Sequence, residues 1–214
     1  MNGNMNVIPG EPVGKSAELK AGSGTYEDGD DIYSALVGFK EIRSSYVNVV
    51  PIRSVYIPRE GDQVIGIVTD IDQSLWVVDV KAPAPAVLRS NDTPWKVDFG
   101  DAGSFLTIGD AVLARIKSYD EIGRIQLTMS DRNSRKIGSG YVIEIMTTKV
   151  AKVIGKEGAM VNAIKKFTEC KIFIGQNGRV WIDGERDGVS KAIMAIKKVE
   201  KEDVNVEDIE KLLG

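Results

Sequence analysis

The pattern of apolar and polar positions is clearest between residues 139 and 200, where it predicts alternating strands and helices. Apolar residues recur at helical spacing on both sides of Gly155-Lys-Glu-Gly158, so this segment is predicted to form helix, tight turn and helix. Strands are predicted at 139–146, 170–175 and 179–183, and Asn177-Gly178 suits a hairpin between the last two. The chain then predicts a helix at 188–200, whose apolar face comprises Val189, Ile193, Ile196 and Val199.

The turn between the first two predicted helices has the composition of a phosphate-binding loop. Its two glycines, Gly155 and Gly158, allow a sharp turn and leave no Cβ between the main chain and a ligand. The helix that follows offers free N–H groups and the positive end of its dipole to a phosphate. A G-x-x-G loop that clamps a nucleic-acid backbone is typical of KH domains, and the predicted order is that of a KH domain ending in a helix. The alternative is an α+β domain in which the glycines only connect two helices.

Residues 59–131 predict a small barrel that can bind single strands. Five predicted strands lie at 61–69, 74–80, 86–89, 109–117 and 124–128. Five strands in about 70 residues, with the longest loop between the third and fourth, favour an OB-type barrel. Such barrels stack bases on aromatic side chains and hold phosphates with cations. The candidates are Trp76 and Phe105 for stacking, and Lys81, Arg89, Arg115, Lys117 and Arg124 for phosphates. Trp76 could instead pack inside the barrel.

The two ends of the chain carry weaker patterns. Residues 1–58 predict a small β domain, with strands at 33–39 and 46–52, which leans on a neighbour or a partner. Five residues at 27–31 include four carboxylates without the register of a calcium loop, which favours a solvated turn. Residues 131–138 are interpreted as a linker between barrel and KH domain. Residues 201–214 predict an acidic tail helix with Val206, Ile209 and Leu213 on one side, either a solvated cap or an intermolecular contact.

The distribution of charge points to the KH-like segment as the nucleic-acid binder. The 214-residue chain has a net charge of −3, which by itself argues against an anionic ligand. Residues 132–200, however, contain 14 basic and 7 acidic residues, whereas residues 59–131 contain 7 and 12. The positive charge is therefore concentrated where a phosphate backbone would need it.

Composition also argues against most enzyme classes. The chain has no histidine, which removes the commonest general base and the Ser-His and Cys-His pairs. Its one cysteine, Cys170, cannot form an internal disulfide and is predicted to be a buried structural thiol. No apolar run is long enough to span a membrane, and the N-terminus lacks the regions of a signal peptide, so a soluble cytoplasmic protein is expected.

The barrel segment resembles the S-one type of OB barrel found in ribosomal proteins. The resemblance lies in Gly61-Asp-Gln-Val-Ile-Gly-Ile-Val68, in Gly109-Asp110 opening the fourth strand, and in Ile125-Gln-Leu-Thr-Met-Ser130. The loop between the third and fourth strands lacks the Ser-x-x-x-His stretch common in that family. This departure prevents a residue-by-residue transfer of the family's RNA-binding face.

Taken together, a β-rich N-terminal domain, an S-one-type barrel and one KH domain resemble the RNA-binding cap subunit of the archaeal exosome. The resemblance covers roughly residues 5–200 and is most specific at Val7-Ile-Pro-Gly-Glu11, 153–161 and 174–182. The last stretch includes Gly175-Gln-Asn-Gly178, which matches a structural G-x-N-G signature of exosome cap proteins. The other cap subunit carries a zinc ribbon, whose four ligands are missing here. A bacterial antiterminator with two KH domains would need a second G-x-x-G pair.

The resemblance implies a non-catalytic subunit with no cofactor, no metal and no catalytic residue. Three copies, in a cap that can include the zinc-ribbon subunit, would sit on a hexameric ring of ribonuclease-PH-like subunits. The cap would capture RNA, favouring adenine-rich tails, and guide its 3′ end into the ring. The expected RNA-binding residues are Gly155, Lys156, Gly158, Lys149, Lys152, Lys165, Lys166, Lys117, Arg115, Arg124 and Trp76.

Two other functional classes stay open at this point. One is a metal-dependent nuclease that would use the carboxylates Asp98, Asp101, Asp110 and Asp120. The other is a free-standing RNA chaperone or a translation or transcription factor, which would not associate with ring subunits.

Overall fold

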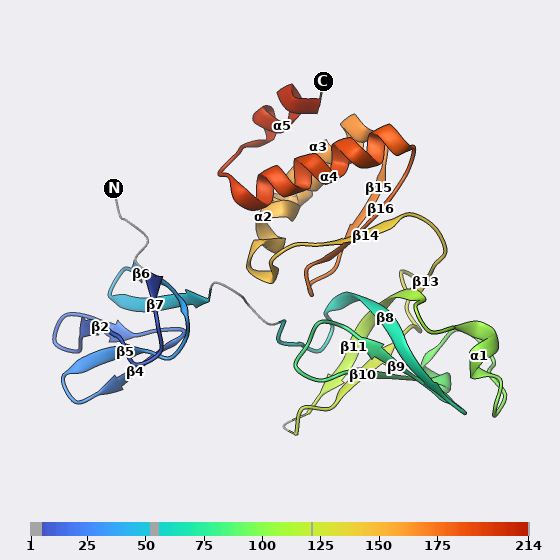
Figure 1. Cartoon of the computed structure of the whole chain (residues 1–214), viewed down its shortest axis with the longest axis horizontal. Coiled ribbons are helices and arrows are strands. Elements are labelled where there is room, and N and C mark those ends of the chain that lie inside the picture. Colours follow the sequence, from blue (N-terminus) through green and yellow to red (C-terminus); the bar gives the residue numbers. More distant parts are fainter. Residues whose placement is uncertain (1–5, 52–55, 121, 214) are drawn as a thin grey trace. The chain divides into compact units, whose positions relative to one another are not determined.

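The computed structural model describes residues 6–51, 56–120 and 122–213, and the chain divides into two compact units, Met1–Ser54 and Val55–Gly214 (Figure 1). The first unit is built from short strands, as the sequence predicts. These are β1 (Asn6–Val7), β2 (Pro12–Lys15), β3 (Lys20–Ala21), β4 (Thr25–Asp28), β5 (Asp31–Ser34), β6 (Gly38–Arg43) and β7 (Tyr46–Pro51). They form two sheets, ordered β1-β6-β7-β3 and β2-β5-β4. Their shared core consists of Val7, Val13, Ile32, Val47 and Val49.

The strand predicted for residues 33–39 is wrong in one respect, because a turn interrupts it. The buried hydroxyl of Ser34 donates to the carbonyl oxygen of Leu36 at 2.6 Å and accepts from the amide of that residue. This side-chain hydrogen bonding ends β5 at Ser34, and β6 begins only at Gly38. Residue 52, at the end of the predicted strand 46–52, lies outside the described residues.

The second unit begins with a closed five-stranded barrel, which confirms the predicted OB-type fold. Its strands are β8 (Gln63–Asp72), β9 (Leu75–Asp79), β10 (Ala86–Arg89), β11 (Ala111–Tyr119) and β12 (Ile125–Thr128). A short 3-10 helix, η1 (Ser90–Asp92), and the helix α1 (Ala102–Phe105) lie between β10 and β11. Closure is achieved by β12, which pairs in parallel with β10 and antiparallel with β11.

The segment interpreted as a linker, residues 131–138, contains a further strand instead. β13 (Arg135–Ile137) pairs antiparallel with β11. The carboxylate of Asp131 starts this strand, since it accepts hydrogen bonds from the amides of Asn133 and Ser134 and fixes the turn before β13. The connection is therefore part of the sheet.

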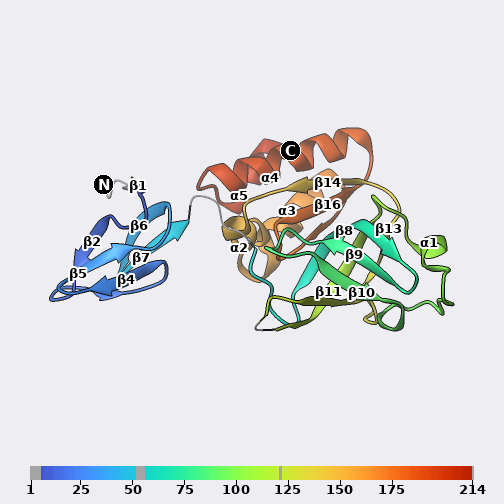
Figure 2. The same ribbon diagram turned by 60° about the horizontal axis from the view of Figure 1, so that its bottom comes forward.

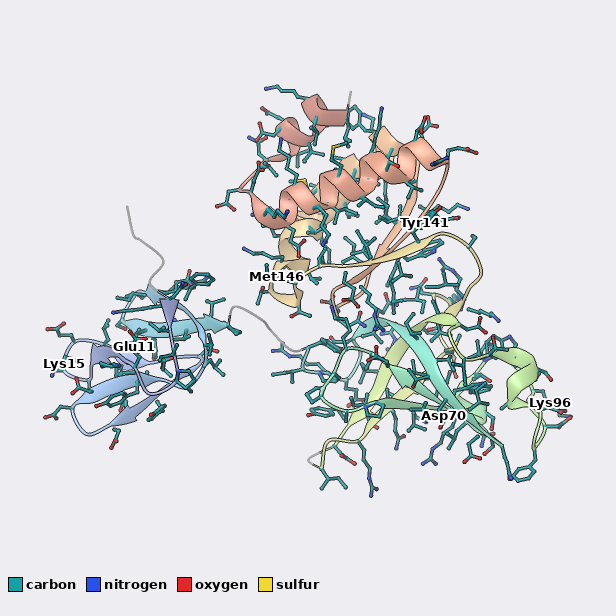
Figure 3. All side chains as sticks on the ribbon, viewed as in Figure 1. Glu11, Lys15, Asp70, Lys96, Tyr141 and Met146 are labelled. Atoms are coloured by element: carbon teal, nitrogen blue, oxygen red, sulfur yellow. The ribbon has the colours of Figure 1, made fainter. Side chains whose placement is uncertain are left out.

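The remaining residues form the predicted KH domain. Its elements are β14 (Tyr141–Glu144), η2 (Thr147–Lys149), α2 (Val150–Ile154), η3 (Lys156–Gly158), α3 (Ala159–Thr168), β15 (Lys171–Ile174), β16 (Arg179–Asp183), α4 (Arg186–Lys201) and α5 (Val206–Leu213). The sheet order is β14-β16-β15. Figure 2 shows α4 and α5 on one side of this sheet and the barrel on the other. Tyr141 and Met146, at and just beyond the ends of the edge strand β14, are exposed (Figure 3).

Cys170 and the tail helix α5 both contribute to the core of the KH domain. Cys170 is buried in the core between the sheet and the helices, as expected of a structural thiol. The tail helix α5 is neither a solvated cap nor free for an intermolecular contact on its apolar side. Ile209 and Leu213 are buried in the same core, and α5 packs mainly against α3. The apolar stripe of α5 is buried within the domain itself, because α3 presents apolar residues toward α5 as well as toward the sheet.

The barrel and the KH domain share a small apolar interface. Ile65 of β8 and Leu113 of β11 point outward from the barrel and pack against Trp181 of β16. Phe173 and Ile137 pack around these three side chains. Trp181 also donates its indole N–H to the carbonyl oxygen of Ser139 at 2.6 Å. The face of the KH sheet opposite the helices is thereby covered by the barrel.

A polar contact between the KH hairpin and the barrel adjoins this apolar interface. The side chain of Asn177 is fully buried, and its amide donates to the carbonyl oxygens of Ile65 at 2.8 Å and Val80 at 3.0 Å. The guanidinium of Arg179 donates to the carbonyl oxygen of Asp79 at 2.6 Å and forms an ion pair with the carboxylate of that residue. Burial raises the pKa of the Asp79 carboxyl, but the hydrogen bonds from Lys81 and Arg179 outweigh it and leave that pKa below its usual value.

The two glycines of Gly175-Gln-Asn-Gly178 are required for different reasons, Gly175 by the contact with the barrel and Gly178 by packing within the KH domain. A Cβ at Gly175 would lie 2.5 Å from the Asn177 side-chain oxygen and 3.1 Å from the amide nitrogen of Ile65. Gly178 has a φ of 78°, and a Cβ there would lie 2.5 Å from the carbonyl oxygen of Ile145. The G-x-N-G stretch is therefore a structural element that seats the KH hairpin on the barrel.

We expect Asn177→Ala to lower the free energy of unfolding by about 1–3 kcal/mol, because the Val80 carbonyl loses this donor and the Ile65 carbonyl keeps only the longer hydrogen bond from Arg179, at 3.3 Å. Urea denaturation of the full chain measures the change. Gln176→Ala is the matched control in the same turn, since the Gln176 contact to the barrel is made by its main-chain amide. Equal stability of the Asn177 variant and the control would contradict this account.

Candidate nucleic-acid interface

The loop between α2 and α3 exposes bare main chain, as the sequence predicts. Gly155 has a φ of 76°, and a Cβ there would lie 2.7 Å from the main-chain nitrogen of Met160. Gly158 has a φ of 79° but would meet nothing closer than 3.4 Å, so its surroundings are open. Glu157 also adopts a positive φ, 51°. Gly155 is thus required by close packing, whereas Gly158 supplies the left-handed conformation from which α3 begins.

The side chains of this loop face solvent. Lys156 and Glu157 are both exposed, so the loop presents one cation and one carboxylate. A phosphate that approaches the loop would be attracted by Lys156 and repelled by Glu157 at similar range. The net electrostatic contribution of the loop is therefore small. The amides of Gly155 and Gly158 donate to the carbonyl oxygens of Ala151 at 3.0 Å and Gly155 at 3.1 Å, so the amides of the two residues between them are the ones that a ligand can use.

The other lysines predicted for this site are distributed over two helices. Lys152 lies on α2 and Lys149 directly precedes it, within about two turns of the loop. Lys165 and Lys166 occupy the last turn of α3, roughly 10 Å from the loop along the helix axis. The structure therefore brings Lys149, Lys152 and Lys156 to one end of the domain and places Lys165 and Lys166 at the other.

The prediction that Trp76 stacks on a base is wrong, because its side chain lies inside the barrel. Trp76 is 0% exposed and packs in the barrel core. Its indole N–H donates to the carbonyl oxygen of Leu106 at 3.2 Å. Alternation along β9 points Trp76 and Val78 inward and leaves Leu75 and Val77 on the outer face. The open alternative from the sequence, packing inside the barrel, is the observed one.

Three of the candidate barrel cations are already paired with carboxylates, the first being Lys81, which donates to Glu144 at 3.0 Å. Arg115 donates to Asp131 at 2.7 Å, and Lys117 donates to Asp92 at 2.7 Å. Burial raises the pKa of the Asp131 carboxyl, but hydrogen bonds from Arg115 and Ser134 hold it below its usual value. The side chains of Arg115 and Lys117 stay partly exposed, so they can still face a phosphate, but their charge is largely compensated.

Arg124, the third of the expected RNA-binding residues of the barrel, is exposed. It directly precedes β12, and within the described residues its side chain has no ion-pair partner. Sequence reasoning missed a nearby aromatic residue, Tyr119, which lies at the end of β11, pairs with Ile125 and is 42% exposed. An exposed aromatic ring on an OB-type barrel can stack a base.

The described ranges hold no group of three or more His, Cys, Asp or Glu residues arranged to bind a metal ion. Nor does any helix among them have the length and apolar character that a membrane crossing requires. Asp110, one of the carboxylates considered for a nuclease, is held by Lys136 at 2.6 Å and by the amide of Thr107 at 2.7 Å.

Family models match two parts of this chain. The model described as the N-terminal region of exosome complex exonuclease RRP4 matches residues 7–43. The KH domain model matches residues 140–198. A solved structure described as an exosome complex RNA-binding protein aligns with a TM-score of 0.68 and 32% identity, covering 75% of this chain and 95% of that one.

Curated relatives match over most of their length. Exosome complex component Rrp4 of Thermoplasma volcanium is 42% identical over 197 residues, which cover 92% of this chain and 83% of the relative. The component of the same name from Pyrococcus abyssi is 39% identical over 202 residues, covering 92% and 76%. Identity at this level over these lengths shows that the chain belongs to the Rrp4 family of exosome complex components.

Proposed function

We propose that this chain is a non-catalytic RNA-binding cap subunit of an exosome, which captures RNA for degradation by a phosphorolytic ring. The observation that carries the proposal is the exposed Gly155-Lys-Glu-Gly158 loop in the KH domain of an Rrp4 family member. The loop offers main-chain N–H groups to a phosphate without a Cβ in the way. The named relatives are exosome components, and the aligned solved structure is described as RNA-binding.

RNA would be held by two surfaces of the second unit. The KH loop with Lys149, Lys152 and Lys156 contacts phosphates, and the exposed ring of Tyr119 offers a stacking position on the barrel. Stacking on an aromatic ring tolerates any base, and purines stack best, which agrees with the proposed leaning toward adenine-rich tails. Because so few cations are uncompensated, each copy binds weakly, and three copies on one strand supply the affinity through effective concentration.

The N-terminal unit supports the proposed docking on a hexameric ring of ribonuclease-PH-like subunits. Among residues 6–51 its apolar core comprises five buried residues, which is small for a free-standing domain. Several of its large apolar side chains are exposed, namely Ile8, Leu36, Val37, Ile42 and Tyr46. Exposed apolar side chains on a small unit favour a protein partner.

We predict that the isolated chain neither hydrolyses nor phosphorolyses RNA. It has no histidine, and the Asp110 carboxylate is committed to Lys136 and Thr107 rather than to a metal. Labelled single-stranded RNA incubated with pure protein, Mg²⁺ and inorganic phosphate should keep its length. Time-dependent shortening that Asp98→Asn or Asp110→Asn abolishes would contradict the proposal.

Removal of residues 1–54 should abolish binding to ring subunits while the second unit stays folded. Residues 55–58 are retained because Tyr56 packs into the barrel core. Gel filtration of the truncated chain with purified ring subunits measures association, and thermal unfolding checks the fold. Co-elution equal to that of the full chain would assign docking to the barrel or the KH domain instead.

In the glycine loop, Gly158→Asp should weaken RNA binding, because a carboxylate would stand where the phosphate approaches. Asp tolerates the left-handed conformation better than most residues, so the fold should survive. Lys156→Glu should weaken binding and flatten its salt dependence by a slope of roughly 1. Salt-titrated binding to a labelled oligoadenylate measures both effects. Lys171→Glu, the same charge change at an exposed position near the opposite end of α3, is the control. Identical binding by all variants would make the loop a mere helix connector.

A further inference from the structure

The acidic segment that follows α4, residues 202–213, is folded onto the helices that carry the RNA-binding lysines. Its helix α5 packs mainly against α3 and is anchored by Ile209, which is 0% exposed, and Leu213, which is 6% exposed. Val204 and Val206 pack against the same core. The segment therefore has a defined position on the KH domain.

The start of α5 is fixed by a reciprocal cap. The amide of Asn205 donates to the Asp208 carboxylate at 3.0 Å, and the amide of Asp208 donates to the Asn205 side-chain oxygen at 2.8 Å. Such a capping arrangement satisfies N–H groups that the first turn leaves unpaired and fixes the entry of the chain. The residues just before it, Glu202 and Asp203, are consequently held in place between α4 and α5.

Glu202 and Asp203 accept hydrogen bonds from Lys152, the cation of α2 that lies nearest the glycine loop. The ammonium group of Lys152 donates to the Asp203 carboxylate at 2.6 Å and to the carbonyl oxygen of Glu202 at 2.7 Å. Asp203 is fully exposed, whereas the Lys152 side chain is only 26% exposed. The hydrogen bond from Lys152 lowers the pKa of the Asp203 carboxyl, with a smaller contribution from the charge of Lys149. The Asp203 carboxylate is thus bound to Lys152, the one lysine of α2.

The geometry is that of an anion already bound where RNA would bind. Lys149 and Lys152 are three residues apart and so face the same side of α2, which leads directly into Gly155. A carboxylate and a phosphate oxygen compete for the same ammonium donors. Residues 202–213 contain five acidic residues and one lysine, so the whole segment repels an approaching strand.

We propose that the segment Glu202–Leu213 is an intramolecular competitor of RNA phosphate, and that Asp203 must leave Lys152 before a strand can use that lysine. This inference rests on the proposed function of the KH domain as an RNA binder. In the free chain Asp203 lowers the RNA affinity of the loop, and it does so without covering the loop itself. α5 stays docked, because its apolar anchors are independent of the ion pair.

The test is a double-mutant cycle on the full chain, with a labelled single-stranded oligoadenylate as the probe. Asp203→Asn should tighten binding about twofold to fivefold, the range expected for one exposed ion pair, and steepen the salt dependence by a slope of about 0.7. Lys152→Gln should weaken binding, and Asp203→Asn should have no effect in the Lys152→Gln background, since both changes act through one contact.

Glu210→Gln is the matched control. It removes one negative charge from an exposed position of the same acidic segment, and no lysine or arginine lies within 4.0 Å of Glu210 among the described residues. Thermal unfolding of all variants should agree closely, because Asp203 is fully exposed. If Asp203→Asn and Glu210→Gln tighten binding equally, the effect is one of net charge and the competitor proposal is overturned.

Failure of the competitor role of Asp203 and failure of RNA binding by the KH domain give different results. Unchanged affinity of Asp203→Asn, while Lys156→Glu still weakens binding, overturns the competitor and leaves RNA capture by the loop intact. Unchanged affinity of Lys152→Gln, Lys156→Glu and Gly158→Asp together overturns the RNA-binding role of the KH domain, and the competitor with it.

Discussion

The fold of the second unit depends on a buried asparagine. Asn177 sits at the tip of the KH hairpin and donates to two main-chain carbonyl groups of the barrel, at Ile65 and Val80. Buried carbonyl groups without a donor are costly, so this contact fixes which part of the barrel the hairpin meets. Trp181 and Phe173 then pack over Ile65 and Leu113, and the KH sheet is covered on the face that its helices do not protect. The barrel and the KH domain consequently form one structural unit with a defined orientation.

That orientation gives the two glycine stretches of the KH domain opposite tasks. Gly175 lets the hairpin approach the barrel, and Gly178 lets it pack against Ile145 of the KH domain, so that a Cβ at either position would collide with its surroundings. Gly155 is confined by Met160 of α3, whereas Gly158 is open. The first stretch is therefore buried inside the protein, while the second stays accessible to a ligand. Sequence spacing alone could not distinguish a glycine pair that binds from one that packs.

The sequence was sufficient where local pattern and tertiary structure agree. The five barrel strands, the KH order and the apolar face of α4 follow from periodicity, because each element buries one continuous face. The sequence was insufficient where a contact between distant residues determines the structure. Trp76 faces inward because of the alternation of β9 in the closed barrel, where Leu106, thirty residues away, also accepts a hydrogen bond from its indole. Residues 135–137 join the barrel because Asp131 turns the chain back onto β11. The tail helix docks because α3 has apolar residues on two sides, which a single helical stripe does not reveal.

Charge compensation is the property that connects these observations to function. Arg115, Lys117 and Lys152 each donate to an internal carboxylate at 2.6–2.7 Å. At these three positions a phosphate must therefore replace an existing partner, and the gain from each contact is correspondingly small. Weak individual contacts allow a strand to slide past a site without being retained by it. Under the proposed function, in which the subunit hands RNA onward to a degrading ring, affinity then has to come from several copies that act on one strand, because that avidity disappears as the strand shortens.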